Sequence, residues 1–130
     1  MDSHGSTQSN LRKVFDAAAA KSLAVVNSLD AEPEMARFVE FVRNNPNSRQ
    51  DVVELVTLSF SEDFYMKWPP IDLWRYAMHA LRWTEVQQLI KSKRQADVDL
   101  HGARCSGVWD DLLEVFDDDW DGAKYFDAFK

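Results

Sequence analysis

The chain has 130 residues, 45% of them apolar, and its 22 acidic against 15 basic residues give a net charge of −7. This length suits one domain and leaves no room for two, and the apolar content is too high for a chain that is disordered throughout. Surplus negative charge argues against direct binding to nucleic acid or to a membrane surface, because both are polyanions that attract basic surfaces.

Cysteine usage and hydropathy give expectations about the compartment. The single cysteine, Cys105, has no second cysteine in the chain with which to form a disulfide. The first residues lack the basic and then apolar pattern of a secretion signal, and no apolar run reaches the roughly 18 residues of a membrane span. Because disulfides belong to oxidising compartments, we expect a cytoplasmic protein.

The N-terminal region divides into a polar terminus and an amphipathic helix. Residues 1–9 are polar, which predicts a flexible terminus and places the helical domain at residues 10–130. From residue 11 to residue 29, apolar side chains recur at three- and four-residue steps, and Ser9 or Asn10 is available as a cap. We therefore expect the first helix over residues 11–29.

Two further helices are expected before residue 62. Pro33 is tolerated in a first helical turn, and the Asn- and Pro-containing residues 44–47 end that helix. Ser48 followed by Asp51 resembles a capping box, with Asp in place of Glu, and favours a third helix toward Glu62.

The next helix is expected to be the central one. Residues 61–68 indicate an irregular link, after which the apolar side chains of residues 70–82 cover about half of a helical circumference. Thr84 and Gln87 are suited to capping a fifth helix, although residues 70 onward fit one kinked rod equally well.

The pattern as a whole predicts an all-α fold. Residues 97–107 resemble a connector, and a short last helix over residues 108–116 leads into an acidic segment. We expect a compact bundle of five to six helices with the helix at 70–82 central, and we find no repeat of constant period.

The last sixth of the chain carries most of the net charge. Residues 109–130, which we call the acidic tail, contain eight acidic and two basic residues. Aromatic residues alternate with these carboxylates, and aromatic anchors surrounded by charge are typical of protein interfaces. The predicted binding residues are Asp110, Asp111, Glu114, Asp117, Asp118, Asp119, Trp120, Asp121, Tyr125 and Phe126. The alternative is that the rings complete the core while the acids only keep the protein soluble.

A second candidate surface lies on the helix at 70–82. Its polar side carries the Arg75 strip, defined as Arg75, Tyr76, His79, Arg82 and Trp83. Such a strip suits an anion or an acidic peptide, with arginine as a bidentate donor between aromatic walls. The alternative, which we favour, is that the arginines pair within the fold, for example with Asp110 and Asp111.

Metal sites and catalytic motifs are incomplete. Asp117, Asp119 and Asp121 match the start of a calcium loop, but its twelfth position is Ala128 where a bidentate Glu is required. His101 and Cys105 supply two metal ligands, and His79 is distant in sequence.

The chain has none of the GxSxG, HExxH, GxxxxGK[ST] or GxGxxG motifs. We expect no enzyme, no bound metal and no cofactor.

Three functional classes follow from these patterns. We expect first a non-catalytic protein that masks a basic partner, as a bacterial immunity-like or inhibitor protein does. The first alternative is an adaptor that self-associates, as a homodimer, through exposed aromatic side chains. The second is a metal-binding or enzymatic protein that uses His79, His101, Cys105 or the acidic loop at residues 117–122.

Overall fold

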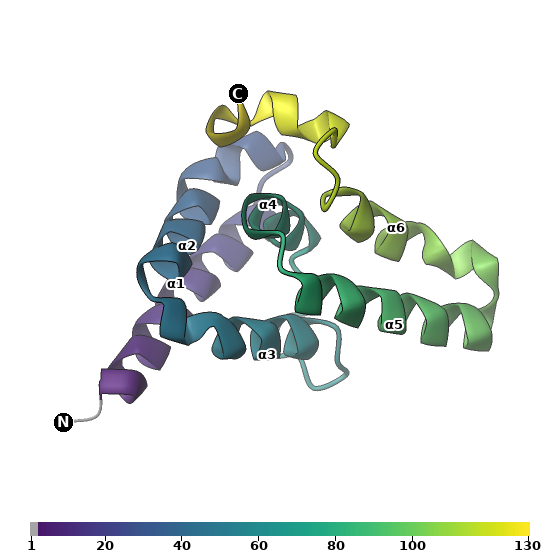
Figure 1. Cartoon of the computed structure of the whole chain (residues 1–130), viewed down its shortest axis with the longest axis horizontal. Coiled ribbons are helices and arrows are strands. Elements are labelled where there is room, and N and C mark those ends of the chain that lie inside the picture. The colour runs from purple at the N-terminus through teal and green to yellow at the C-terminus, as the bar shows by residue number, and fades with distance from the viewer. Residues whose placement is uncertain (1–2) are drawn as a thin grey trace. The chain divides into compact units, whose positions relative to one another are not determined.

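The computed structural model describes residues 3–130, and its secondary structure is entirely helical (Figure 1). Six α-helices and no strand occur in this range, which confirms the predicted all-α class and the number of helices. The helices are α1 (Ser3–Ala24), α2 (Glu32–Asn44), α3 (Arg49–Ser59), α4 (Ile71–Leu81), α5 (Thr84–His101) and α6 (Gly107–Glu114). Among them, none combines the length and apolar character that crossing a bilayer requires.

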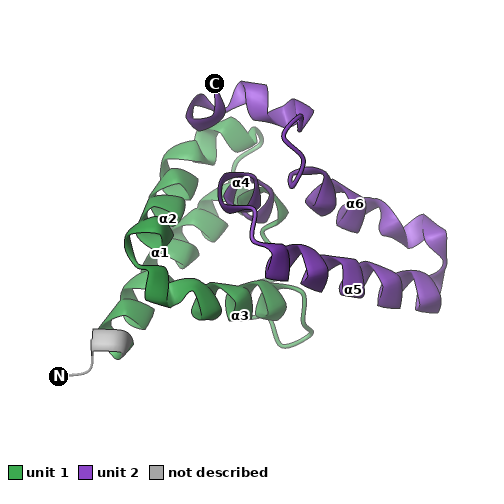
Figure 2. Ribbon diagram, viewed as in Figure 1, with its two compact units in different colours: residues 1–73 green, residues 74–130 purple. Residues whose placement is uncertain are grey.

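The chain divides into two compact units, which Figure 2 distinguishes by colour. The N-terminal unit is Met1–Leu73 and the C-terminal unit is Trp74–Lys130, so the division falls in the first turn of α4. A single domain over residues 10–130, and a central place for the helix at 70–82, stay predictions.

The first helix is displaced from its predicted position. It begins at Ser3, within the segment expected to be a flexible terminus, and it ends at Ala24; Met1 and Asp2 lie outside the described residues. The earlier end has a local cause. The side chain of Asn27 accepts a hydrogen bond of 3.0 Å from the amide of Leu29 and caps a 3₁₀ turn, η1 (Ser28–Ala31), that replaces the last predicted turn.

The second helix occurs where it was expected, and the third begins where it was expected but ends at Ser59, short of Glu62. Pro33 lies in the first turn of α2, and α3 begins directly after the 3₁₀ turn η2 (Pro46–Ser48). The capping box is not formed, because the hydroxyl of Ser48 donates to the carbonyl oxygen of Asn45 at 2.7 Å. The Ser48 hydroxyl, which was expected to cap the start of α3, therefore bonds to the residue that follows the end of α2.

Apolar side chains of all three helices form the interior of the N-terminal unit. Helices α1 and α2 lie side by side, and the rings of Phe15 and Phe38 meet edge to face with centroids 6.0 Å apart (Figure 1). The buried side chains are Leu11, Phe15, Ala18, Ala19, Met35, Phe38, Val39, Val42, Val52, Leu55 and Val56. Their three- and four-residue spacing is the pattern from which the helices were predicted.

Helices α4 and α5 are separate and not one kinked rod. Arg82, between them, has a φ of 51°, which places it in the left-handed region. Its amide donates to the carbonyl oxygen of Met78 at 2.7 Å, which closes the end of α4. Trp83 is then extended and precedes the first residue of α5, so the predicted Thr84 cap is wrong by one position.

Helices α5 and α6 form a helical hairpin in the C-terminal unit (Figure 1). Helix α5 continues to His101, so the predicted connector at 97–107 is reduced to Gly102 and the 3₁₀ turn η3 (Ala103–Ser106). Polar contacts join the helices, among them the hydrogen bond of 2.9 Å that the indole of Trp109 donates to Asp97 and the ion pair of 2.8 Å between Arg94 and Asp110.

Candidate functional site

The acidic tail is folded, and its last residues form short 3₁₀ turns. After α6, the chain passes through η4 (Asp121–Tyr125) and η5 (Asp127–Phe129). Backbone hydrogen bonds of 3.1 Å, each spanning three residues, join Ala123 to Trp120, Phe126 to Ala123 and Phe129 to Phe126. Because a 3₁₀ helix has three residues per turn, these four side chains lie on one side of the segment.

That side packs against α4. The ring of Tyr76 lies 5.1 Å from the ring of Phe126 and 5.0 Å from that of Phe129, measured between centroids. The imidazole of His79 lies 5.0 Å from Trp120 and 4.7 Å from Phe129. Only 8% of Trp120 and 6% of Phe126 are exposed, so these rings form a small aromatic core on the Arg75 strip.

A buried histidine connects this aromatic core to the end of α6. Nδ1 of His79 lies 2.7 Å from the carbonyl oxygen of Val115, and since a carbonyl only accepts, Nδ1 carries the proton that is donated. In the neutral ring Nε2 is then an acceptor, and it lies 3.5 Å from a guanidinium nitrogen of Arg82.

Both arginines of the strip pair with the tail. Arg75 forms an ion pair with Glu114 and donates through Nε to the carbonyl oxygen of Asp111 at 3.1 Å. Its guanidinium also lies 5.2 Å from the centroid of the Trp120 ring. Arg82 forms an ion pair with Asp118 and donates to the carbonyl oxygen of His79 at 2.9 Å. The acidic tail and the Arg75 strip, which were expected as two separate surfaces, are thus in contact with each other. The arginines form their ion pairs with Glu114 and Asp118, and not with Asp110 and Asp111 as the example in the prediction had it.

The carboxylates of the tail point outward. All eight acidic residues of the tail are exposed: Asp110, Asp111, Glu114, Asp117, Asp118, Asp119, Asp121 and Asp127. Five of them have a basic partner, the remaining pairs being Asp121 with Lys124 and Asp127 with Lys130, both at 3.2 Å. Within residues 3–130, Asp111, Asp117 and Asp119 take part in no ion pair.

Two of the exposed pairs shift the pKa of a partner. Hydrogen bonds from Arg94 and then from Ser106 hold the pKa of Asp110 below its ordinary value. The hydrogen bond to Asp121 raises the pKa of Lys124. Both directions favour the charged form, so these side chains stay ionised near neutral pH.

The residues that were predicted to bind a partner lie partly in the interior and partly at the surface. Trp120 and Phe126 are buried, so they support the surface and are not anchors on it. Tyr125 is the ring that remains outside, with 58% of its surface exposed. Phe129 and Val115 contact His79, but they were not among the predicted residues. The signal for the tail contacts was the three-residue spacing of Trp120, Ala123, Phe126 and Phe129, which indicates a 3₁₀ segment and not an α-helix.

The candidate metal ligands are not brought together. Among the described residues, no group of three or more His, Cys, Asp or Glu side chains is placed to hold a metal ion. Asp121 of the calcium-like segment is paired with Lys124. Nε2 of His101 lies 3.9 Å from an oxygen of Asp97, and the sulfur of Cys105 contacts the backbone carbonyl of His101 at 3.8 Å.

Comparisons with models of protein families, with curated proteins and with solved structures find no match to this chain.

Proposed function

We propose that the C-terminal unit is a non-catalytic binding module whose acidic surface covers a basic protein, in the manner of a bacterial immunity-like or inhibitor protein. The proposed surface contains the exposed carboxylates from Asp110 to Asp121 and the ring of Tyr125. Direct binding to nucleic acid is not part of the proposal, because the surface is negative.

The observation that carries the proposal is the division of the tail into an apolar inner side and a charged outer side. The rings of Trp120 and Phe126 are buried, which holds the surrounding backbone in one conformation. The carboxylates that flank them are exposed. A surface that is ordered before binding loses less conformational entropy in a complex than a flexible acidic tail does.

The internal ion pairs leave these carboxylates available to a partner. The side chain of Asp118 is paired with Arg82 and still 94% exposed, and exposed pairs contribute only about 0–1 kcal/mol to stability. A basic partner therefore meets carboxylates that are weakly paired or, at Asp111, Asp117 and Asp119, form no ion pair with any residue that the structure describes. Complementary charge also raises the association rate above the unsteered value of roughly 10⁵–10⁶ M⁻¹s⁻¹.

The test is a triple variant, D111N/D117N/D119N, which removes only carboxylates that form no ion pair. We expect its melting temperature to match that of the original chain, since no internal contact is lost. We expect capture of basic proteins from native lysate to fall by about tenfold or more, because three charges leave the interface.

The matched control carries three equivalent changes in the N-terminal unit, E40Q/E62Q/D63N, all at exposed positions. It alters the net charge by the same amount and is expected to capture the same proteins as the original chain. Equal capture by the triple variant and by this control would contradict the proposal.

Self-association is the second candidate, and one observation favours it. The end of the α5–α6 hairpin exposes two large apolar side chains, Leu100 and Val108, on a segment with few buried residues. Ionic strength distinguishes the two functions. Apolar self-association persists at high salt, whereas an interface steered by carboxylates weakens.

A further inference from the structure

Gly122, in the 3₁₀ turn η4 of the acidic tail, lies directly against the ring of Trp120. A Cβ atom at Gly122 would lie 2.8 Å from Cζ2, 2.9 Å from Cε2 and 3.0 Å from Nε1 of the indole. Non-bonded carbon atoms are in optimal contact at about 3.5–4.0 Å, so a side chain here and the ring cannot both keep these places. The absence of a side chain at Gly122 is therefore what lets the indole lie on the backbone.

The backbone itself does not require glycine at this position. The φ angle of Gly122 is not in the left-handed region, where Gly102 is found with a φ of 89°. Replacing glycine by alanine at a position of compatible backbone usually stabilises a chain slightly. The cost of a side chain at Gly122 thus comes from the ring of Trp120 and not from the backbone.

The indole has little room to withdraw. The imidazole of His79 lies 5.0 Å from its ring and the guanidinium of Arg75 lies 5.2 Å from it, both measured to the ring centroid. The rings of Phe126 and Phe129 follow at 6.1 and 6.4 Å. Only 8% of Trp120 is exposed. Because a closely packed interior does not absorb an extra methyl group without displacement, a side chain at position 122 would push the indole out of its place in the aromatic core.

The ring of Trp120 also anchors the part of the tail in which carboxylates are densest. Four of them lie within three residues of it: Asp117, Asp118, Asp119 and Asp121. The amide of Trp120 donates to the carbonyl oxygen of Asp117 at 3.4 Å, and the amide of Ala123 donates to the carbonyl oxygen of Trp120 at 3.1 Å. The turns before and after the ring thus both close on the backbone of Trp120. The position of the indole therefore determines where these carboxylates stand.

We propose that Gly122 is a positioning residue of the acidic surface. By leaving room for the indole, it holds the carboxylates from Asp117 to Asp121 in the arrangement that a basic partner meets. The contact with a partner rests on the function proposed above. The packing of Trp120 on Gly122 lies within the C-terminal unit and is measured separately.

The test compares Gly122→Ala with the matched control Gly107→Ala, by NMR of the full chain. Both variants make the same chemical change in the same unit and keep every charge. Gly107 begins α6, and no atom of another described part of the chain lies within 4 Å of a Cβ atom built there. We expect Gly122→Ala to lose the nuclear Overhauser contacts between Trp120 and His79, and Gly107→Ala to keep them. Retention of these contacts in Gly122→Ala overturns the proposal.

Capture of basic proteins from native lysate measures the effect on the surface. We expect Gly122→Ala to reduce capture about threefold to tenfold, because side chains that are ordered only on binding cost affinity. Gly107→Ala is expected to capture as much as the original chain.

The same capture series separates this inference from the proposed function. If Gly122→Ala captures as much as Gly107→Ala while D111N/D117N/D119N captures less, the positioning role is overturned and the proposed function stands. If the triple variant captures as much as its own control, the proposed function is overturned, and the positioning role with it.

A double variant tests whether the effect of the methyl group passes through the ring. The indole is absent from a Trp120→Ala chain, so adding Gly122→Ala is expected to lower the melting temperature no further. A further loss as large as that in the original chain overturns the assignment to the ring. The original chain supplies a check without any substitution: Hε1 and Hζ2 of the indole should show nuclear Overhauser contacts to the α-protons of Gly122, and their absence overturns the proposal.

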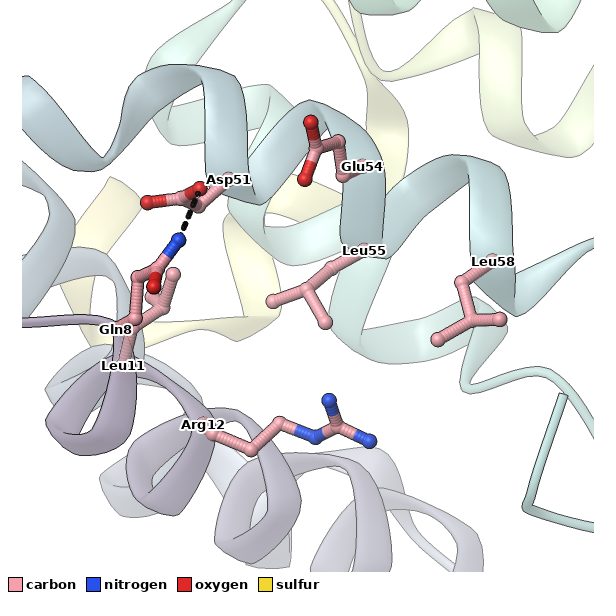
Figure 3. A pocket seen from close by; sticks show the side chains of 7 residues that line it. All are labelled: Gln8, Leu11, Arg12, Asp51, Glu54, Leu55 and Leu58. Carbon is pink, nitrogen blue, oxygen red and sulfur yellow. Dashed lines mark hydrogen bonds between the residues drawn. The ribbon is translucent and has the colours of Figure 1, made fainter. Parts of the chain in front are cut away.

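Resonances of the N-terminal unit show whether a variant is folded. Figure 3 shows Leu11, Leu55 and Leu58 lining a pocket between α1 and α3, in the other unit than Gly122. We expect the methyl groups of these leucines to keep their dispersed chemical shifts in both glycine variants. Loss of this dispersion in Gly122→Ala alone would assign Gly122 to the stability of the whole fold, and it would overturn a role confined to the acidic surface.

Discussion

Whether an aromatic side chain of the tail faces inward or outward determines whether it contributes to the stability of the fold or to the exposed surface. Trp120 contacts His79 and lies under the guanidinium of Arg75, so its ring is enclosed by α4 and by the tail itself. Tyr125 is five residues further along and 58% exposed, and Nζ of Lys124 lies 5.2 Å from its ring centroid. The sequence shows both as aromatic residues among carboxylates, and only the contacts distinguish a core ring from a surface ring.

Truncating the two rings is therefore expected to have different consequences. Trp120→Ala removes a buried indole and leaves a cavity, which should lower the free energy of unfolding by about 3 kcal/mol. Tyr125→Ala removes an exposed ring and should change the free energy of unfolding by less than about 0.5 kcal/mol. Urea unfolding measures both. Similar losses in the two variants would mean that the tail is not packed as described.

At the scale of the elements, the sequence predicts helices better than it predicts their ends. The apolar spacing located the helical segments, because three- and four-residue steps place side chains on one face, but it did not separate α4 from α5. Helix ends depend on hydrogen bonds that compete with one another, such as the bond from Ser48 to Asn45 that excludes the capping box. The left-handed backbone of Arg82, which separates α4 from α5, has no marker in the sequence because no glycine stands there.

The candidate site was predictable in its charges and not in its contacts. The concentration of carboxylates after residue 109 is a property of composition, and the structure leaves all of them exposed. The pairing of Arg82 with Asp118 joins residues 36 apart, which no local spacing indicates. The tail also folds as 3₁₀ turns, whose three-residue period differs from the helical period used to find the other elements.

The irregular segment at residues 61–68 is tied to α1 by Tyr65, and this contact predicts a dependence on pH. Burial, together with the hydrogen bond to Asp16, raises the pKa of Tyr65 above its ordinary value of 10.0. The folded chain thus holds the phenol proton more tightly than the unfolded chain does. The resulting stabilisation is complete below pH 10 and is lost as the pH rises through the raised pKa.

The measurement compares the original chain with Tyr65→Phe. We expect the difference in their free energies of unfolding to decline from about pH 10 upward, with the pKa of a free tyrosine near 10 as the reference. A difference that stays constant over this range would show that Tyr65 does not titrate differently in the folded chain.

At the scale of the whole molecule, the distribution of charge matters more than its sum. The tail carries most of the surplus of carboxylates, and the basic side chains that it neutralises, Arg75, Arg82 and Arg94, belong to the same unit. What remains exposed is an acidic surface supported by buried rings. The proposed recognition of a basic protein depends on that support, since a disordered acidic segment would be ordered only on binding.

The packing of the tail onto α4 is tested most directly by NMR of the full chain. We predict nuclear Overhauser contacts from the ring of Phe129 to the rings of His79 and Tyr76, whose centroids lie 4.7 and 5.0 Å away. These contacts should persist at high salt, because they are apolar. Chemical shifts typical of a random coil over residues 117–130, with no such contacts, would contradict the account.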